Sequence, residues 1–170
     1  DIDNRRGTMA DKDAMQMGSR LHRKIQGRMG ADYHAEVPLK TEIDYETFLL
    51  VVEGRADGIF KEQEKYVIDE IKGVFRDVER MEEADPIHLA QAKCYACIYA
   101  GQLNLEEIGV QMTYANLDSE EIRRFHYTYM KAELESWFEE LTAAYRKWAQ
   151  MQLEWKHARK DSIGKTVFPY

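Results

Sequence analysis

Apolar residues recur along the chain with two different spacings, and these spacings divide it into helices and strands. Spacings of three and four residues, typical of one face of a helix, predict helices at 11–29, 85–101 and 131–159. Segments rich in apolar and aromatic residues, separated by polar turns, predict strands at 33–43, 48–60, 66–75, 105–115 and 121–130. We therefore expect a mixed α/β fold, with a central sheet flanked by helices and a long helix after the last strand.

The middle helix has the clearest predicted boundaries. Asp85 is suited to cap its first turn and Pro86 to occupy its first position, while Gly101 is expected to end it. An apolar face should pack on the sheet, and it comprises Ile87, Ala90, Cys94, Cys97 and Ile98. A polar stripe with helical spacing lies beside that face and comprises His88, Gln91 and Tyr95.

Candidate chemistry is concentrated in the predicted hairpin formed by 48–60 and 66–75. Side chains two apart share one face of a strand, so Glu70 and Lys72 project together while Asp69 and Ile71 point the other way. Asp57, near the end of the first strand, is expected to lie opposite them. Two carboxylates beside a lysine suit Mg²⁺ or Mn²⁺, which prefer oxygen ligands. A charged hairpin exposed to solvent would also contain such residues.

A metal bound there would support the attack of water on a phosphodiester, because it stabilises charge on the phosphate oxygens and lowers the pKa of its bound water. Four sequence elements then occur in a characteristic order: His22, Asp57, Glu70-Ile71-Lys72 and Gln91-x3-Tyr95. Together they resemble the PD-(D/E)XK nuclease superfamily, and the QxxxY element resembles its RecB-like branch. The resemblance covers residues 13–130.

This resemblance implies a restriction-endonuclease-like core that hydrolyses DNA phosphodiesters, on single strands or ends. It implies that a divalent metal is bound by His22, Asp57, Glu70 and the backbone carbonyl of Ile71. Lys72 would act on the attacking water, while Gln91 and Tyr95 would position the lysine or the DNA strand. Many relatives hold an iron–sulfur cluster with four cysteines, whereas this chain has two, so we expect no cluster.

Composition narrows the class of protein. The net charge of -7 argues against a protein that coats nucleic acid nonspecifically, because such binding relies on positive charge. Local positive charge is available on the first predicted helix from Arg20, Arg23, Lys24 and Arg28. Apolar runs are shorter than the ~20 residues of a membrane helix, and the polar start shows no secretory signal, so we expect a cytoplasmic protein without a membrane partner.

The expected organisation is a single nuclease domain over 1–170, with its core at 13–130, a C-terminal helix at 131–159 and a tail at 160–170. In that tail, Val167-Phe168-Pro169-Tyr170 resembles the segment before the motor of DinG-like helicases. The resemblance predicts a covalently linked helicase domain. An alternative from another class is a catalytically inactive module that keeps this fold and binds DNA or a partner domain.

Overall fold

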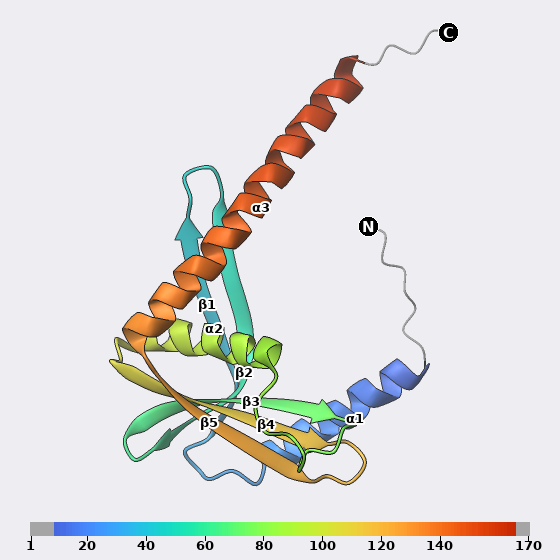
Figure 1. The fold of residues 1–170 in the computed structure, drawn as a ribbon, viewed down its shortest axis with the longest axis vertical. Coiled ribbons are helices and arrows are strands. Elements are labelled where there is room, and N and C mark those ends of the chain that lie inside the picture. Colours follow the sequence, from blue (N-terminus) through green and yellow to red (C-terminus); the bar gives the residue numbers. More distant parts are fainter. Residues whose placement is uncertain (1–8, 166–170) are drawn as a thin grey trace. The chain divides into compact units, whose positions relative to one another are not determined.

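The computed structural model of the chain describes residues 9–165, with side chains described from residue 15 to residue 160. Within residues 9–165, eight elements follow one another (Figure 1): α1 Met9–Gln26, β1 His34–Asp44, β2 Leu49–Glu62, β3 Lys65–Val74, α2 Pro86–Leu103, β4 Glu107–Asn116, β5 Ile122–Met130 and α3 Lys131–Lys165. The predicted α/β class is therefore confirmed, with every predicted helix and strand present. The segment 167–170 lies outside the described residues.

The five strands form one mixed sheet in the order β1-β2-β3-β4-β5. Neighbouring strands are antiparallel except for β3 and β4, which are parallel. A parallel pair needs a crossover connection, and α2 provides it. The chain thus places the predicted hairpin in the middle of the sheet, next to α2.

The chain divides into two compact units, Asp1–Leu134 and Glu135–Tyr170. The first unit contains the sheet, α1 and α2, and the second consists of α3 from its second turn onward. In α3, the Thr142 hydroxyl donates a hydrogen bond to the Phe138 carbonyl at 2.8 Å. No helix in the part of the chain that the structure describes is long and apolar enough to span a membrane.

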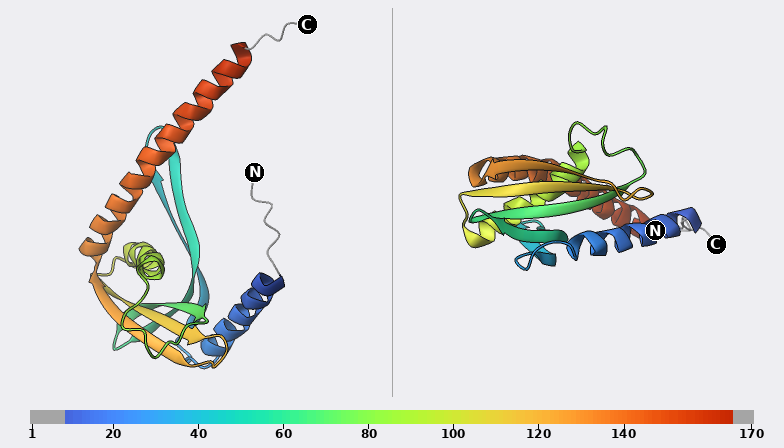
Figure 2. Two further views of the ribbon diagram at one scale, coloured as in Figure 1. Left: turned by 45° about the vertical axis from the view of Figure 1, so that its right-hand side comes forward. Right: turned by 90° about the horizontal axis from the view of Figure 1, so that it is seen from below.

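Helices α1 and α2 cover opposite faces of the sheet (Figure 2). On one face, Leu21 and Ile25 of α1 pack against Ile71 of β3 in a buried cluster. On the other face, Gln91 of α2 accepts a hydrogen bond from Lys72. Because consecutive strand residues point to opposite faces, Ile71 and Lys72 place the two helices on the two sides of β3.

The predicted start of α2 is confirmed, and its predicted end and apolar face are partly wrong. The Asp85 side chain accepts a hydrogen bond from the Ile87 N–H, as expected of a cap. The helix continues past Gly101 to Leu103 and is capped by Asn104, which takes a left-handed conformation (φ 51°) that asparagine tolerates. Ile87 is 79% exposed, because the helical period of 3.6 residues places it on the side of the helix away from buried Ala92 and Ala96. The buried positions are Ala92, Ala96, Cys97, Ile98 and Ala100.

Gly58 allows the loop after α1 to pack tightly on β2. A Cβ atom at Gly58 would lie 1.9 Å from the Tyr33 ring. The Tyr33 hydroxyl donates a hydrogen bond to Asp69 Oδ2 at 3.0 Å, and Asp69 pairs with Gly58 across the strands. The ring therefore crosses β2 to reach a buried carboxylate on β3.

We predict that Gly58→Ala lowers the free energy of unfolding by roughly 1–3 kcal/mol, because the added methyl group displaces the Tyr33 ring. Gly101→Ala is the matched control, since nothing lies within 4 Å of its added Cβ. In a helix, that change should stabilise the protein by about 0.5–1 kcal/mol. Urea denaturation measures both effects. Equal effects of the two substitutions would contradict the packing at Gly58.

Candidate active site

The sheet opens between β2 and β3, and the candidate site lies at this opening. The two strands pair only from Gly58↔Asp69 to Glu62↔Lys65. Before Gly58, β2 stays paired with β1, whereas β3 stays paired with β4 as far as Val74. Asp57 and Glu70 are the first residues beyond the last pair. Backbone groups of β3 on this side therefore need partners other than β2.

The Asp57 carboxylate takes the place of the missing strand. Its Oδ2 accepts a hydrogen bond from the Ile71 N–H at 2.7 Å. The N–H and carbonyl of one strand residue point to the same edge, so the Ile71 carbonyl is directed at the same opening. A carboxylate and a backbone carbonyl thus face the gap together.

Helix α1 supplies two side chains to Asp57. His22 Nδ1 lies 3.3 Å from Asp57 Oδ1, and Gln26, one turn later, donates to the Asp57 backbone carbonyl at 2.9 Å. Burial alone would lower the pKa of His22. The hydrogen bond and charge of Asp57, with the charge of Glu70, outweigh that effect and raise this pKa. The imidazole therefore gains stability as a cation beside the carboxylates.

Glu36 of β1 lies opposite Asp57. Its Oε1 accepts a hydrogen bond from Gln26 at 3.1 Å, and the side chain forms a 3.0 Å ion pair with Arg55. Glu36 has a positive φ of 57°, which is uncommon for glutamate. The pairs on either side of it are Ala35↔Gly58 and Val37↔Ala56, so the irregular residue faces Asp57 across β1 and β2. Local strain thus lies directly beside the carboxylate that bridges the gap.

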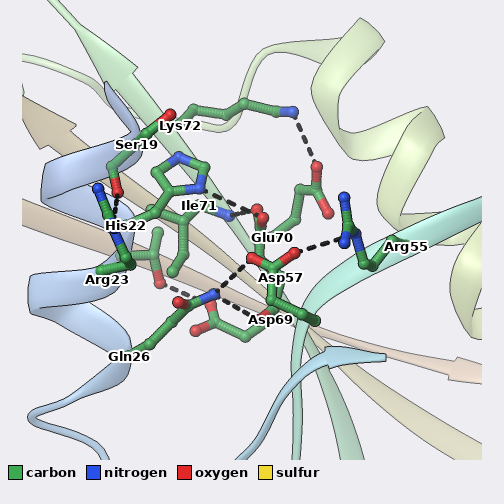
Figure 3. Close-up of polar contacts among 12 residues, drawn as sticks. Ser19, His22, Arg23, Gln26, Arg55, Asp57, Asp69, Glu70, Ile71 and Lys72 are labelled. Atoms are coloured by element: carbon green, nitrogen blue, oxygen red, sulfur yellow. Dashed lines mark hydrogen bonds and ion pairs between the residues drawn. The ribbon is translucent and has the colours of Figure 1, made fainter. Parts of the chain in front are cut away.

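Lys72 is held on the α2 side of β3 by two acceptors. Its Nζ donates to Glu70 Oε1 at 2.8 Å and to Gln91 Oε1 at 2.9 Å. Gln91 in turn donates to the Tyr95 hydroxyl at 3.1 Å. Figure 3 shows the Lys72 and Glu70 side chains pointing toward one another, with His22 and Asp57 nearby. The lysine is thus fixed by groups from β3 and α2.

Glu70 is a buried carboxylate in an unfavourable environment. The residue is 2% exposed, and burial, followed by the charge of Asp57, raises its pKa to about 7 against the opposing effect of Lys72. Within the described residues, its Oε2 is the buried side-chain polar atom without a hydrogen-bond partner. An unpartnered buried oxygen is costly, and a cation is one partner that would satisfy it.

The donor set suits a hard divalent cation by its chemistry, since it offers the carboxylates of Asp57 and Glu70, the Ile71 carbonyl and one imidazole. The geometry as it stands is less favourable. Residues 9–165 contain no group of three or more His, Cys, Asp or Glu side chains arranged to hold a metal ion. Both Asp57 oxygens already contact other groups, the Ile71 N–H and His22 Nδ1, so a metal bound by Asp57 would have to share or replace these contacts.

A second buried acid, Asp69, lies on the opposite face of β3 and is fully partnered. Its oxygens accept hydrogen bonds from Thr113 at 2.7 Å, from Gln111 at 3.0 Å and from Tyr33 at 3.0 Å. Burial raises the pKa of Asp69 although these donors favour the carboxylate. This network ties β3 to β4 and to the loop after α1 directly behind the gap.

The structure brings the predicted site residues into two adjoining groups. One contains His22, Asp57 and Ile71, and the other contains Glu70, Lys72, Gln91 and Tyr95. His88, the third member of the predicted polar stripe, instead contacts the Tyr114 hydroxyl at 3.1 Å. On the predicted basic face of α1, Lys24 forms an ion pair with Glu120.

Sequence reasoning missed Gln26, Tyr33 and the partners of Asp69. Gln26 had a usable signal, because it follows His22 by four residues on one helix and must share its face. Tyr33 and Thr113 had none, since they meet Asp69 from positions far away in the sequence.

No family model matches the sequence, and no curated protein matches it. Among solved structures, the fold is similar to that in "Crystal structure of SSO0001", with a TM-score of 0.50 and 20% sequence identity. The similarity covers 77% of this chain and 60% of that chain. It therefore supports a shared fold and carries no information about activity.

We predict that the raised pKa of Glu70 makes the protein less stable as the pH increases. The folded protein keeps this proton up to pH about 7, whereas the unfolded chain releases it near 4.5. Unfolding therefore releases a proton between these pH values, and the free energy of unfolding falls across that window. Glu70→Gln should remove this slope and, above pH 7, stabilise the protein by up to about 3 kcal/mol.

Denaturation at several pH values measures this effect. Glu62→Gln, at an exposed position of β2, changes the net charge equally and serves as the control. The same pH slope in both variants would show that Glu70 is not the group that titrates.

Proposed function

We propose that the chain is a divalent-metal-dependent deoxyribonuclease with a restriction-endonuclease-like core, similar to the RecB-like branch of the PD-(D/E)XK superfamily. The observation that carries this proposal is the buried Glu70 carboxylate, paired with Lys72 and left with an unpartnered oxygen beside the Asp57 gap. A structural carboxylate would be expected to have its oxygens satisfied, as those of Asp69 are. The unsatisfied group indicates a site built for a ligand.

Mg²⁺ or Mn²⁺ would be held by His22, Asp57, Glu70 and the Ile71 carbonyl. When bound, such an ion supplies positive charge to the phosphate oxygens and a water of lowered pKa. Asp57 has a second role that needs no metal, because it fixes the Ile71 backbone and hence the direction of that carbonyl. Its substitution should therefore affect folding as well as activity.

Lys72 would orient the attacking water or neutralise negative charge that develops on the phosphate. Gln91 holds the lysine from α2, and Tyr95 holds Gln91, so both act by positioning. The Tyr95 hydroxyl also lies 2.5 Å from where a Cβ of Gly54 would be, so β2 passes close to this ring. The lysine is thus placed by contacts from both sides of the gap.

The proposed substrate is DNA, as single strands or ends, and the proposed context is a larger polypeptide that includes a helicase. Strand cleavage requires positive charge only along the track of the bound strand, which is compatible with a net charge of -7.

We predict that Glu70→Ala and Lys72→Ala each lower the rate of DNA cleavage by about 10²–10⁴-fold, the range for loss of a group acting in the transition state. The assay uses single strands labelled at the 5′ or the 3′ end, with Mg²⁺ or Mn²⁺. Lys65→Ala is the matched control, because Lys65 lies on the same strand but pairs with Glu107. Full activity in Lys72→Ala would refute the proposed role of the lysine.

The second candidate is a catalytically inactive module that binds DNA or a partner domain. It is favoured by the arrangement of the acids, since no group of three or more potential ligands among the described residues is positioned for a metal. Such a module would keep the fold without needing a cation.

We predict that Mn²⁺ stabilises the protein, which the inactive module would not require. At roughly 100 times its dissociation constant, a ligand that binds only the folded state raises the free energy of unfolding by about 2.7 kcal/mol. This stabilisation should disappear in Glu70→Ala and persist in Lys65→Ala. DNA binding without cleavage or stabilisation under either metal would favour the inactive module.

A further inference from the structure

Beyond Lys72, the α2 face of the sheet carries a second group of basic side chains, two arginines and a histidine. Lys72 pairs with Tyr114 in the parallel β3–β4 ladder, and Tyr114 pairs with Arg123 in β5. Paired residues share a face, so these three side chains form a row across the sheet. Arg76 follows β3 in the chain, and His88 lies in the first turns of α2.

Two aromatic rings, Tyr114 and Phe125, contact the basic side chains of this face. The Arg76 guanidinium lies over the Tyr114 ring at 5.7 Å, and His88 Nδ1 lies 3.1 Å from the Tyr114 hydroxyl. Phe125 meets Tyr114 edge to face at 6.0 Å and carries the Arg123 guanidinium at 5.6 Å. The Tyr114 and Phe125 rings therefore support the side chains of Arg76, His88 and Arg123, and such contacts are favourable for arginine.

The backbone beneath these side chains is fixed by hydrogen bonds. The Asn116 amide donates to the Arg76 carbonyl at 3.0 Å. The Asp85 N–H donates to the Tyr114 hydroxyl at 2.9 Å, and the Ala84 N–H donates to the Tyr127 hydroxyl at 3.3 Å. The loop after β3 and the start of α2 are thus tied to β4 and β5, which preorganises the row for a ligand.

The charges around His88 connect this row to the candidate site. Burial, then the positive charges of Lys72 and Arg76, lower the pKa of His88, while Asp85 opposes them. His88 therefore lies within the electric field of both Lys72 and Arg76. The Asp85 carboxylate is engaged in capping α2, since it accepts a hydrogen bond from the Ile87 N–H.

We propose that Arg76, His88 and Arg123 form a phosphate track, which binds backbone phosphates of single-stranded DNA next to the phosphodiester at Lys72. The assignment of that phosphodiester rests on the proposed function. A guanidinium matches the geometry of a phosphate, and both arginines are exposed. With Nδ1 at the Tyr114 hydroxyl, Nε2 is the ring nitrogen of His88 that remains for a phosphate.

The test is the salt dependence of DNA binding, measured by fluorescence anisotropy of labelled oligothymidine in EDTA, which prevents cleavage. Each phosphate contact that is lost should lower the slope of log affinity against log salt by about 0.7 for a single strand. We predict that Arg76→Ala and Arg123→Ala each lower the slope by this amount, and that the double variant lowers it by about 1.4. Arg123→Lys should keep the wild-type slope, because the charge remains.

Lys61→Ala is the matched control, since Lys61 also lies over an aromatic ring, that of Tyr66 at 4.7 Å, but at the far end of β2. A purely structural role of the arginines would change thermal stability without changing the slope. The phosphate track would be overturned if the salt slopes of the arginine variants stay unchanged, if Lys61→Ala changes the slope equally, or if the wild-type chain does not bind the DNA. If the chain cleaves DNA but the arginine variants keep the wild-type slope, the phosphate track is wrong and the nuclease proposal stands. If the slopes change as predicted but no DNA is cleaved, the phosphate track stands and the nuclease proposal is wrong.

Discussion

The candidate site exists because β2 and β3 stop pairing at Asp57 and Glu70 while each remains paired with its other neighbour. Such an opening exposes backbone groups in the middle of a sheet, and these groups need partners. The Asp57 carboxylate meets that need by accepting the Ile71 N–H. One side chain therefore stabilises the opening and also lines it. Glu70 and Lys72 reach the opening from β3 itself, and His22 and Gln91 reach it from helices on the two faces.

The two buried acids of β3 show how the fold distinguishes a structural carboxylate from one available for chemistry. Asp69 has hydrogen-bond donors from a threonine, a glutamine and a tyrosine, which offset the cost of its burial. Adjacent Glu70 has Lys72 and an oxygen with no partner. Two neighbouring carboxylates thus differ in whether their oxygens have hydrogen-bond partners, and the one with an unpartnered oxygen, Glu70, lies at the gap. We interpret this difference as a sign that Glu70 is held for a ligand.

Local patterns along the sequence predicted the elements well, because helix spacing, strand alternation and the Asp85-Pro86 cap depend on neighbouring residues. They also predicted that Glu70 and Lys72 project together and that Asp57 lies near them. Patterns failed where the outcome depends on distant partners or on small differences in backbone preference. The end of α2 at Leu103, capped by Asn104, rather than at Gly101 is one such case, since asparagine and glycine are both compatible with a helix end. The opening between β2 and β3 is another, because strand register beyond a hairpin follows from packing over the whole sheet.

The central claim is that Asp57 and Glu70 bind one divalent cation together at this opening. Anomalous diffraction from crystals grown with Mn²⁺ tests it most directly, because the anomalous signal identifies the metal independently of the side-chain positions. Our account predicts a single strong peak within about 2.1 Å of oxygens from both carboxylates and from the Ile71 carbonyl, the distance expected for an ion of the Mg²⁺ type. A crystal that contains Mn²⁺ but shows no peak at this opening would contradict the account.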